Sequence, residues 1–201
     1  MKAGAYGPTF MMPRLFDSFG ASEKVVGTML MVTTVVTVIT VYFSGHLSDL
    51  FGRLRTLGAA CLAIAASLYL NGTIAAVGPW MVLASVLLGF GWGLTYSLGP
   101  IVLTRLVRPN ERVQFFTLLS VFVMAGFGLS PVFASMLEAA GFSIRGAFLA
   151  TAVMCIVSAI LFFLLSEPIK VHALNPAPEV SSHITIASLV AVLKSRAVIP
   201  V

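Results

Sequence analysis

Five stretches of about 20 residues without a charged side chain constrain this chain more than any other feature. They are residues 25–44, 57–76, 80–103, 115–137 and 147–166. A helix needs about 20 mostly apolar residues to cross the hydrocarbon core of a bilayer. Inside that core the backbone must satisfy its own hydrogen bonds, so each stretch is expected to be helical. Only 9% of the residues are charged, against about 25% in soluble domains. We therefore predict an all-α polytopic membrane bundle.

The two ends of the sequence differ from this pattern. Residues 3–16 are apolar, but at about 1.5 Å per residue they cross only ~20 Å of a ~30 Å core, so we predict a partial first helix. Residues 1–166 are predicted to form the bundle. Residues 167–201 contain a Pro-rich polar stretch, a short amphipathic helix and the start of another span, and are predicted to be a cytoplasmic linker. We interpret the chain as a fragment of a longer protein.

The basic residues predict the orientation in the membrane. Eight lie at one set of helix ends and three at the other. The eight are Arg53, Arg55, Arg105, Arg108, Arg112, Lys170, Lys194 and Arg196, and the three are Arg14, Lys24 and Arg145. By the positive-inside rule, residues 45–56, 105–114 and 167–201 are cytoplasmic. We expect an integral protein of a bacterial cytoplasmic (inner) membrane, and the net charge of +5 reflects topology rather than nucleic-acid binding.

The turn "GHLSDLFGRLRT", residues 45–56, combines charge with fixed spacing. Arginines alone would satisfy topology, but Gly45, Asp49, Gly52 and Arg53 follow one another as G-x-x-x-D-x-x-G-R. The stretch resembles the signature loop of the major facilitator superfamily, G-x-L-x-D-x-x-G-R-[RK], although leucines replace two of that family's usual basic residues. This resemblance implies the N-terminal six-helix half of a transporter that rocks against a second half. It also implies that Asp49 is a latch that engages a helix end of the other half.

Two further segments resemble motifs of the same family. "RPNER", with Arg108, Glu111 and Arg112, resembles the basic turn after the fourth helix. "GFGLSPVFAS", with Gly126, Ser130 and Pro131, resembles the fifth-helix motif of antiporters, with small residues that allow close helix contact. The fourth-helix arginine of such antiporters is replaced by Ser85, so the resemblance does not imply proton-coupled antiport.

Polar and aromatic residues at helical spacing suggest where a substrate binds. Thr33 and Thr37 begin a threonine stripe on the second helix, and Trp92 and Tyr96 share a face of the fourth. The hydroxyls have an alternative interpretation, because Ser and Thr in membrane helices also bond to their own or a neighbouring helix. The candidate cavity residues are Tyr6, Thr33, Thr37, Trp92, Tyr96 and Met124.

No Asp, Glu, Lys, Arg or His lies within the five spans, and such a residue would mark an ion or proton relay. We predict a secondary transporter of small molecules, most consistent with an efflux-type permease for an amphipathic or apolar compound. The alternatives are an uptake permease for a sugar or another metabolite, or a non-transporting six-helix membrane protein. The sequence has no nucleotide-binding loop, paired carboxylates or His cluster that would indicate an enzyme. We expect no cofactor, metal or nucleic acid, and as partners the substrate, the bilayer and a C-terminal six-helix half.

Overall fold

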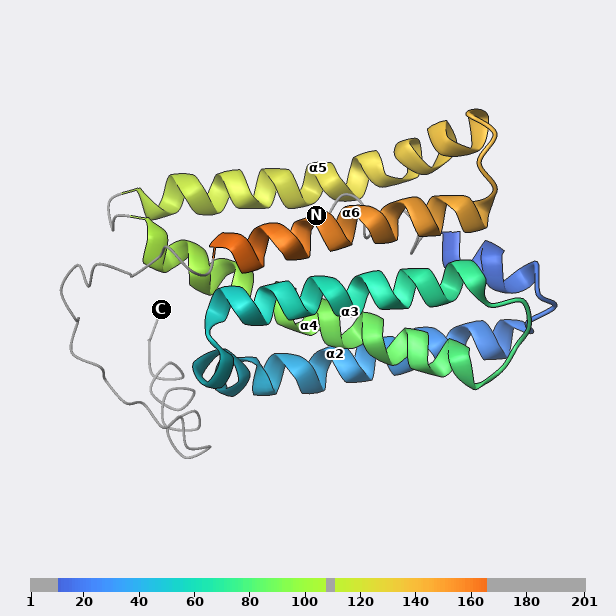
Figure 1. Cartoon of the computed structure of the whole chain (residues 1–201), viewed down its shortest axis with the longest axis horizontal. Coiled ribbons are helices and arrows are strands. Elements are labelled where there is room, and N and C mark those ends of the chain that lie inside the picture. The colour runs from blue at the N-terminus through green and yellow to red at the C-terminus, as the bar shows by residue number, and fades with distance from the viewer. Residues whose placement is uncertain (1–10, 108–110, 166–201) are drawn as a thin grey trace, which may run out of the picture. The chain divides into compact units, whose positions relative to one another are not determined.

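The computed structural model describes residues 11–107 and 111–165, except for the side chains of seven residues near the end of α4 and in α5. Residues 11–17 are helical, and five long helices follow (Figure 1). They are α2 (Glu23–Phe51), α3 (Arg53–Thr73), α4 (Pro79–Leu106), α5 (Arg112–Ala139) and α6 (Ile144–Leu165). The described part contains no strand. The prediction of an all-α membrane bundle is confirmed, and each predicted complete span lies largely within one helix.

Four of these helices are long and apolar enough to span a bilayer within the described residues. They cover Glu23–Phe51, Arg53–Thr73, Pro79–Thr104 and Ile144–Leu165. Helix α5 covers the remaining predicted span. Its apolar part, Arg112–Gly126, is shorter than the four candidate spans. The predicted linker 167–201 and the first residues of the partial helix 3–16 lie outside the described residues.

The sequence places a turn at residues 45–56, and the structure corrects this. Helix α2 continues to Phe51 and α3 begins at Arg53, so only Gly52 separates the two helices. None of the charged residues of this stretch breaks a helix. The backbone leaves the helical path only at Gly52, where φ is 83° and ψ is 140°.

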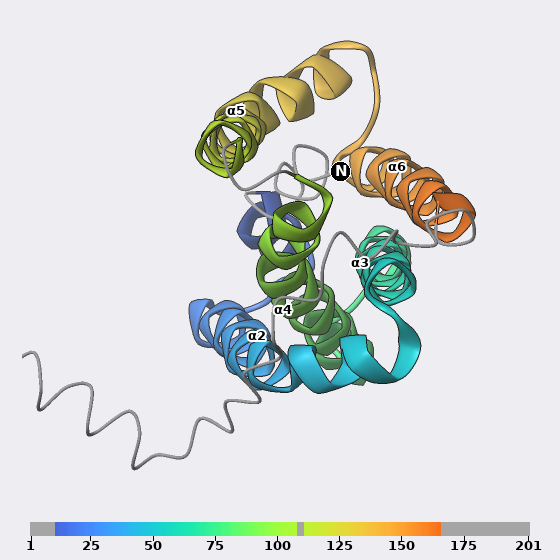
Figure 2. The same ribbon diagram turned by 90° about the vertical axis from the view of Figure 1, so that its left-hand side faces the viewer.

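Helix α4 is the centre of the bundle. It packs against α2 on one side and α3 on the other, and α6 packs against α3 (Figure 2). Helix α5 makes few contacts with α4 and α6. The helical residues 11–17 contribute Met12, Leu15 and Phe16 to a buried cluster that also contains Leu68 and Phe148.

Three glycines allow α4 to approach its neighbours closely. A Cβ atom on Gly93 would lie 2.6 Å from Cβ of Thr40 on α2. On the opposite side of the helix, a Cβ atom on Gly91 would lie 2.7 Å from the carbonyl oxygen of Ala60 on α3. Gly89 is likewise pressed against the α2 backbone. These distances are shorter than real Cβ contacts, so glycine is required at the three positions for this packing.

Hydroxyl groups add hydrogen bonds between the same helices. Ser67 of α3 donates to the carbonyl of Ala84 on α4 at 2.7 Å, and both residues are fully buried. Interhelical hydrogen bonds of this kind stabilise membrane proteins by ~0.6 kcal/mol each. Lipid is as apolar as a leucine side chain, so close packing and these bonds hold the helices together instead of hydrophobic burial between them.

Substituting Gly93 with Ala should destabilise the bundle by about 1–3 kcal/mol, because the added methyl overlaps atoms of α2 that are close to its backbone. The measurement is unfolding in detergent micelles. Gly99→Ala is the matched control on the same helix, since nothing lies within 4 Å of its Cβ position. It should be neutral or stabilising, as Ala is the better helix former. Equal stability of the two variants would contradict the close contact between α2 and α4.

Candidate functional site

Two regions gather the residues that the sequence singles out. The first is the connection between α2 and α3, which carries Asp49, Gly52 and Arg53 at one end of the bundle. The second is the face of α4 that carries Trp92 and Tyr96, about midway along the helix.

Backbone and hydroxyl bonds fix the α2–α3 connection. The N–H of Gly52 donates to the carbonyl of Ser48 at 3.0 Å. The hydroxyl of Ser48 donates to the carbonyl of Gly45 at 2.7 Å, and the hydroxyl of Thr56 donates to the carbonyl of Gly52 at 2.9 Å. Ser48 and Thr56 are both buried. The connection is therefore a defined sharp turn, and Asp49 lies in the last turn of α2 just before it.

Asp49 and Gly45 lie one helical turn apart on the same face of α2. Both are exposed, and Asp49 makes no ion pair with a residue of the described part. A Cβ atom on Gly45 would meet nothing within 4 Å, so the packing among the described residues does not require glycine there. Arg53 is half-buried at the start of α3. This face of α2 is open to a contact from outside the described part of the chain.

The threonine stripe of α2 forms a helix interface. The hydroxyl of Thr33 donates to the carbonyls of Met29 at 3.0 Å and Ser85 at 3.3 Å. The hydroxyl of Thr37 donates to the carbonyls of Thr33 at 2.8 Å and Gly89 at 3.2 Å. Each hydroxyl thus bridges its own helix and α4. Their geometry gives no support to the prediction that they line a substrate cavity, and instead matches the alternative of bonding between helices.

Trp92 and Tyr96 lie one helical turn apart on α4. Trp92 is half-buried and packs against the cluster that contains Leu68 and Phe148. Tyr96, one turn further on, is 40% exposed. On α5, Met124 is exposed as well. These three remain candidate cavity residues, whereas Tyr6 lies outside the described residues.

The structure describes the two other motifs only in part. Gly126 is buried in α5, and the helix continues through Ser130 and Pro131, whose side chains lie outside the description. Arg108 also lies outside it. Glu111 is half-buried immediately before α5, and Arg112, its first residue, is exposed.

Sequence reasoning missed two features. The first is the close packing through Gly89, Gly91 and Gly93, for which the spacing G-x-G-x-G was an available signal. The second lies at the opposite end of the bundle, where Arg14 pairs with Glu138 at 3.1 Å. No local signal indicated this pair, because its members are 124 residues apart. Within the described residues no group of three or more potential metal ligands is found.

Gly52→Ala should destabilise the protein by about 1–3 kcal/mol, because a residue with a side chain rarely adopts the backbone angles of this position. Gly45→Ala is the matched control, since Gly45 is helical with open space around its Cβ position. The control should be neutral or stabilising by up to ~1 kcal/mol. The measurement is again unfolding in detergent. If Gly52→Ala were as stable as the control, the turn would not depend on its positive φ.

Comparison with known proteins supplies one match. The sequence model of the Major Facilitator Superfamily matches residues 3–200. No curated protein and no solved structure matches the chain.

Proposed function

The chain belongs to the Major Facilitator Superfamily, a family of membrane transporters, and on that basis we propose that it forms one half of a secondary transporter that exports amphipathic or apolar compounds by alternating access. Its arginine-rich helix ends, including Arg53, Arg55 and Arg112, lie in the cytoplasm in this proposal. A second six-helix half completes the cavity.

The absence of charge from the described spans is the observation that carries the substrate class. From Thr56 to Thr104, through both α3 and α4, the sequence contains no Asp, Glu, Lys, Arg or His. A charged substrate at the centre of the membrane would need a partner of opposite charge, since an unpaired buried charge is costly. This half offers none in its described spans, so an uncharged or largely apolar compound fits it better.

Four threonine hydroxyls on α2, α4 and α6 are also engaged with the backbone. The hydroxyls of Thr33, Thr37, Thr95 and Thr151 all donate to carbonyl groups. On α4 this leaves an aromatic surface to face the substrate. Aromatic rings suit compounds with an apolar body and one polar end, because they provide large contact area at little cost in side-chain entropy.

The proposal that the protein exports its substrate, rather than taking it up, rests on the resemblance of residues 126–135 to the fifth-helix motif of antiporters. The burial of Gly126 agrees with a packing role for that motif. Transport assays on the full-length protein, with a panel of compounds offered on each side of the membrane, test both direction and substrate. Net uptake of a sugar or another metabolite would replace the export proposal by its alternative.

The exposed face of α2 supports a latch between the halves. Asp49 is presented by the defined turn at Gly52, and Gly45 beside it leaves room for another helix to approach. A carboxylate binds favourably to the N–H groups at the N-terminus of a helix. We infer that such a helix end of the second half contacts Asp49 while the cytoplasmic side is closed.

Asp49→Asn should therefore lower the transport rate of the full-length protein about tenfold or more, as a hydrogen bond to a charged group is worth ~1.5–3 kcal/mol. The amount of protein in the membrane should not change. Asp17→Asn, which removes an exposed acid at the opposite end of the bundle, is the control and should transport normally. Normal transport by Asp49→Asn would reduce Asp49 to an ordinary surface charge.

Tyr96→Ala should raise the concentration of an apolar substrate needed for half-maximal transport by roughly 2- to 10-fold, the equivalent of an aromatic contact of ~0.5–1.5 kcal/mol. Tyr69→Ala is the matched control, because Tyr69 is an exposed tyrosine on α3. It should leave the substrate concentration dependence unchanged. Equal effects of the two substitutions would argue against a substrate site on this face of α4.

A further inference from the structure

The connection between α3 and α4 is unusually apolar for a segment at the end of two membrane helices. Residues 74–78 read Ile-Ala-Ala-Val-Gly, and no Asp, Glu, Lys, Arg or His occurs between Arg55 and Arg105. The two other connections at this end of the bundle are charged. One contains Asp17, with Glu23 and Lys24 following it, and the other lies between Glu138 and Arg145.

The length of α3 places this connection at the edge of the hydrocarbon core. In the proposed orientation Arg55, in the first turn of α3, lies at the membrane boundary of the arginine-rich end. By Thr73, where α3 ends, the helix has risen ~27 Å at about 1.5 Å per residue, and the core is ~30 Å thick. The connection therefore lies where lipid chains end, in the leaflet opposite the arginine-rich ends.

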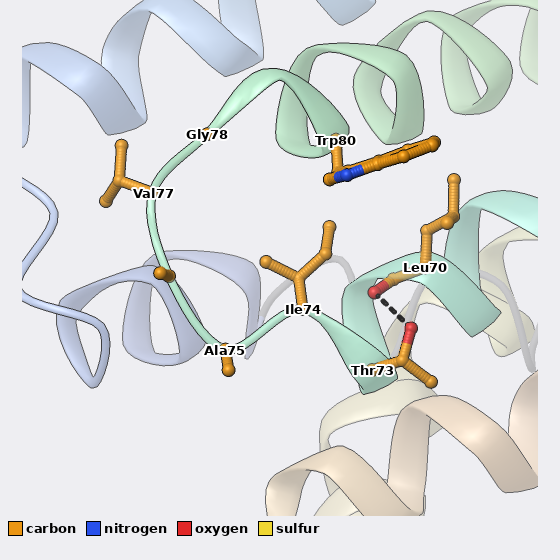
Figure 3. Close-up of a pocket in the computed structure, with 8 residues that line it drawn as sticks. Leu70, Thr73, Ile74, Ala75, Val77, Gly78 and Trp80 are labelled. Carbon is orange, nitrogen blue, oxygen red and sulfur yellow. Dashed lines mark hydrogen bonds between the residues drawn. The ribbon is translucent and has the colours of Figure 1, made fainter.

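A pocket of about 510 Å³ lies beside this connection (Figure 3). Ile74 points toward the indole ring of Trp80, and Leu70 lies next to the same ring (Figure 3). Thr73 is the one lining residue with a polar side chain apart from the indole N–H of Trp80. Its hydroxyl donates to the carbonyls of Tyr69 and Leu70, both at 3.0 Å. The hydroxyl is thus already satisfied, and the lining suits a hydrocarbon rather than a polar ligand.

We propose that the α3–α4 connection is immersed at the hydrocarbon edge and that its pocket binds an acyl chain of a phospholipid. Val77 and Trp80 are 47% and 60% exposed, so in water they would present a continuous apolar surface. Tryptophan is enriched at this level of the membrane, where its ring contacts lipid chains and its N–H reaches the interface. The lack of nearby charge means that the chain of the lipid, and not its headgroup, is recognised.

The 201 residues contain two tryptophans, so Trp92→Phe, combined with Phe in place of every tryptophan of the second half, leaves Trp80 as the only reporter. We would titrate the detergent-solubilised full-length variant with phosphatidylcholine brominated on its acyl chains. Quenching of Trp80 should saturate at about one lipid per chain and reverse with unbrominated lipid. Adding Ala76→Leu, which fills the pocket, should weaken binding and so raise the lipid concentration at half-saturation at least fivefold. Ala66→Leu, at an exposed alanine of α3 outside the pocket, should leave it unchanged.

Quenching that never saturates, or that is equal in the two leucine variants, would overturn the binding site.

A second measurement tests immersion without substituting either tryptophan or filling the pocket. In vesicles, Ala75→Cys should resist a membrane-impermeant maleimide, whereas Ser22→Cys in the charged connection should be labelled. Rapid labelling of both would overturn immersion. Neither experiment measures transport, so their failure leaves the proposed function standing.

Discussion

The close approach of α4 to its two neighbours is the contact on which the rest of the bundle depends. Lipid solvates apolar side chains as well as another helix does, so helices associate only where they fit closely or share hydrogen bonds. Gly89 and Gly93 provide that fit toward α2, and Gly91 provides it toward α3. Gly58 continues the pattern, since its Cβ position lies 2.9 Å from the ring of Phe163 on α6. Helix α5 packs little against its neighbours, and the position of Gly128 on it is open.

This packing also decides which sides of α4 its neighbours occupy. Residues two apart on a helix are separated by about 200°, so Gly91 faces nearly opposite to Gly89 and Gly93. Helices α2 and α3 occupy those two sides. At the interface with α2, the hydroxyls of Thr33 and Thr37 donate to backbone carbonyls of α4. By the same spacing Tyr96, seven residues after Gly89, lies near the α2 side of α4, and Trp92 lies between the two contacts, where it packs against the buried cluster that contains Leu68. The glycines of α4 thus fix the two sides of the helix that its neighbours occupy.

The fold could be predicted from the sequence because the bilayer fixes both the length and the secondary structure of each span. The connection at residues 45–56 was predicted too long, since charge marks the membrane surface and not the end of a helix. The role of Thr33 could not be predicted either. A threonine stripe looks the same in sequence whether it faces a cavity or a helix, and the decisive contact joins Thr33 to Ser85, 52 residues away. For the site, the spacing of Asp49 and Gly52 was informative, whereas the residues that would contact Asp49 lie outside the described chain.

The glycines of the bundle occur for different physical reasons, and this difference separates packing from the proposed latch. Gly52 is required by its positive φ, and Gly93 by the proximity of Thr40. Gly45 has neither reason, yet a glycine inside a helix costs about 1 kcal/mol relative to Ala. A helix end that donates hydrogen bonds to Asp49 must come within about 3 Å of its carboxylate. A side chain one turn away on the same face would obstruct that approach. The cost of Gly45 is therefore understandable if the contact that offsets it forms only with the second half of the transporter.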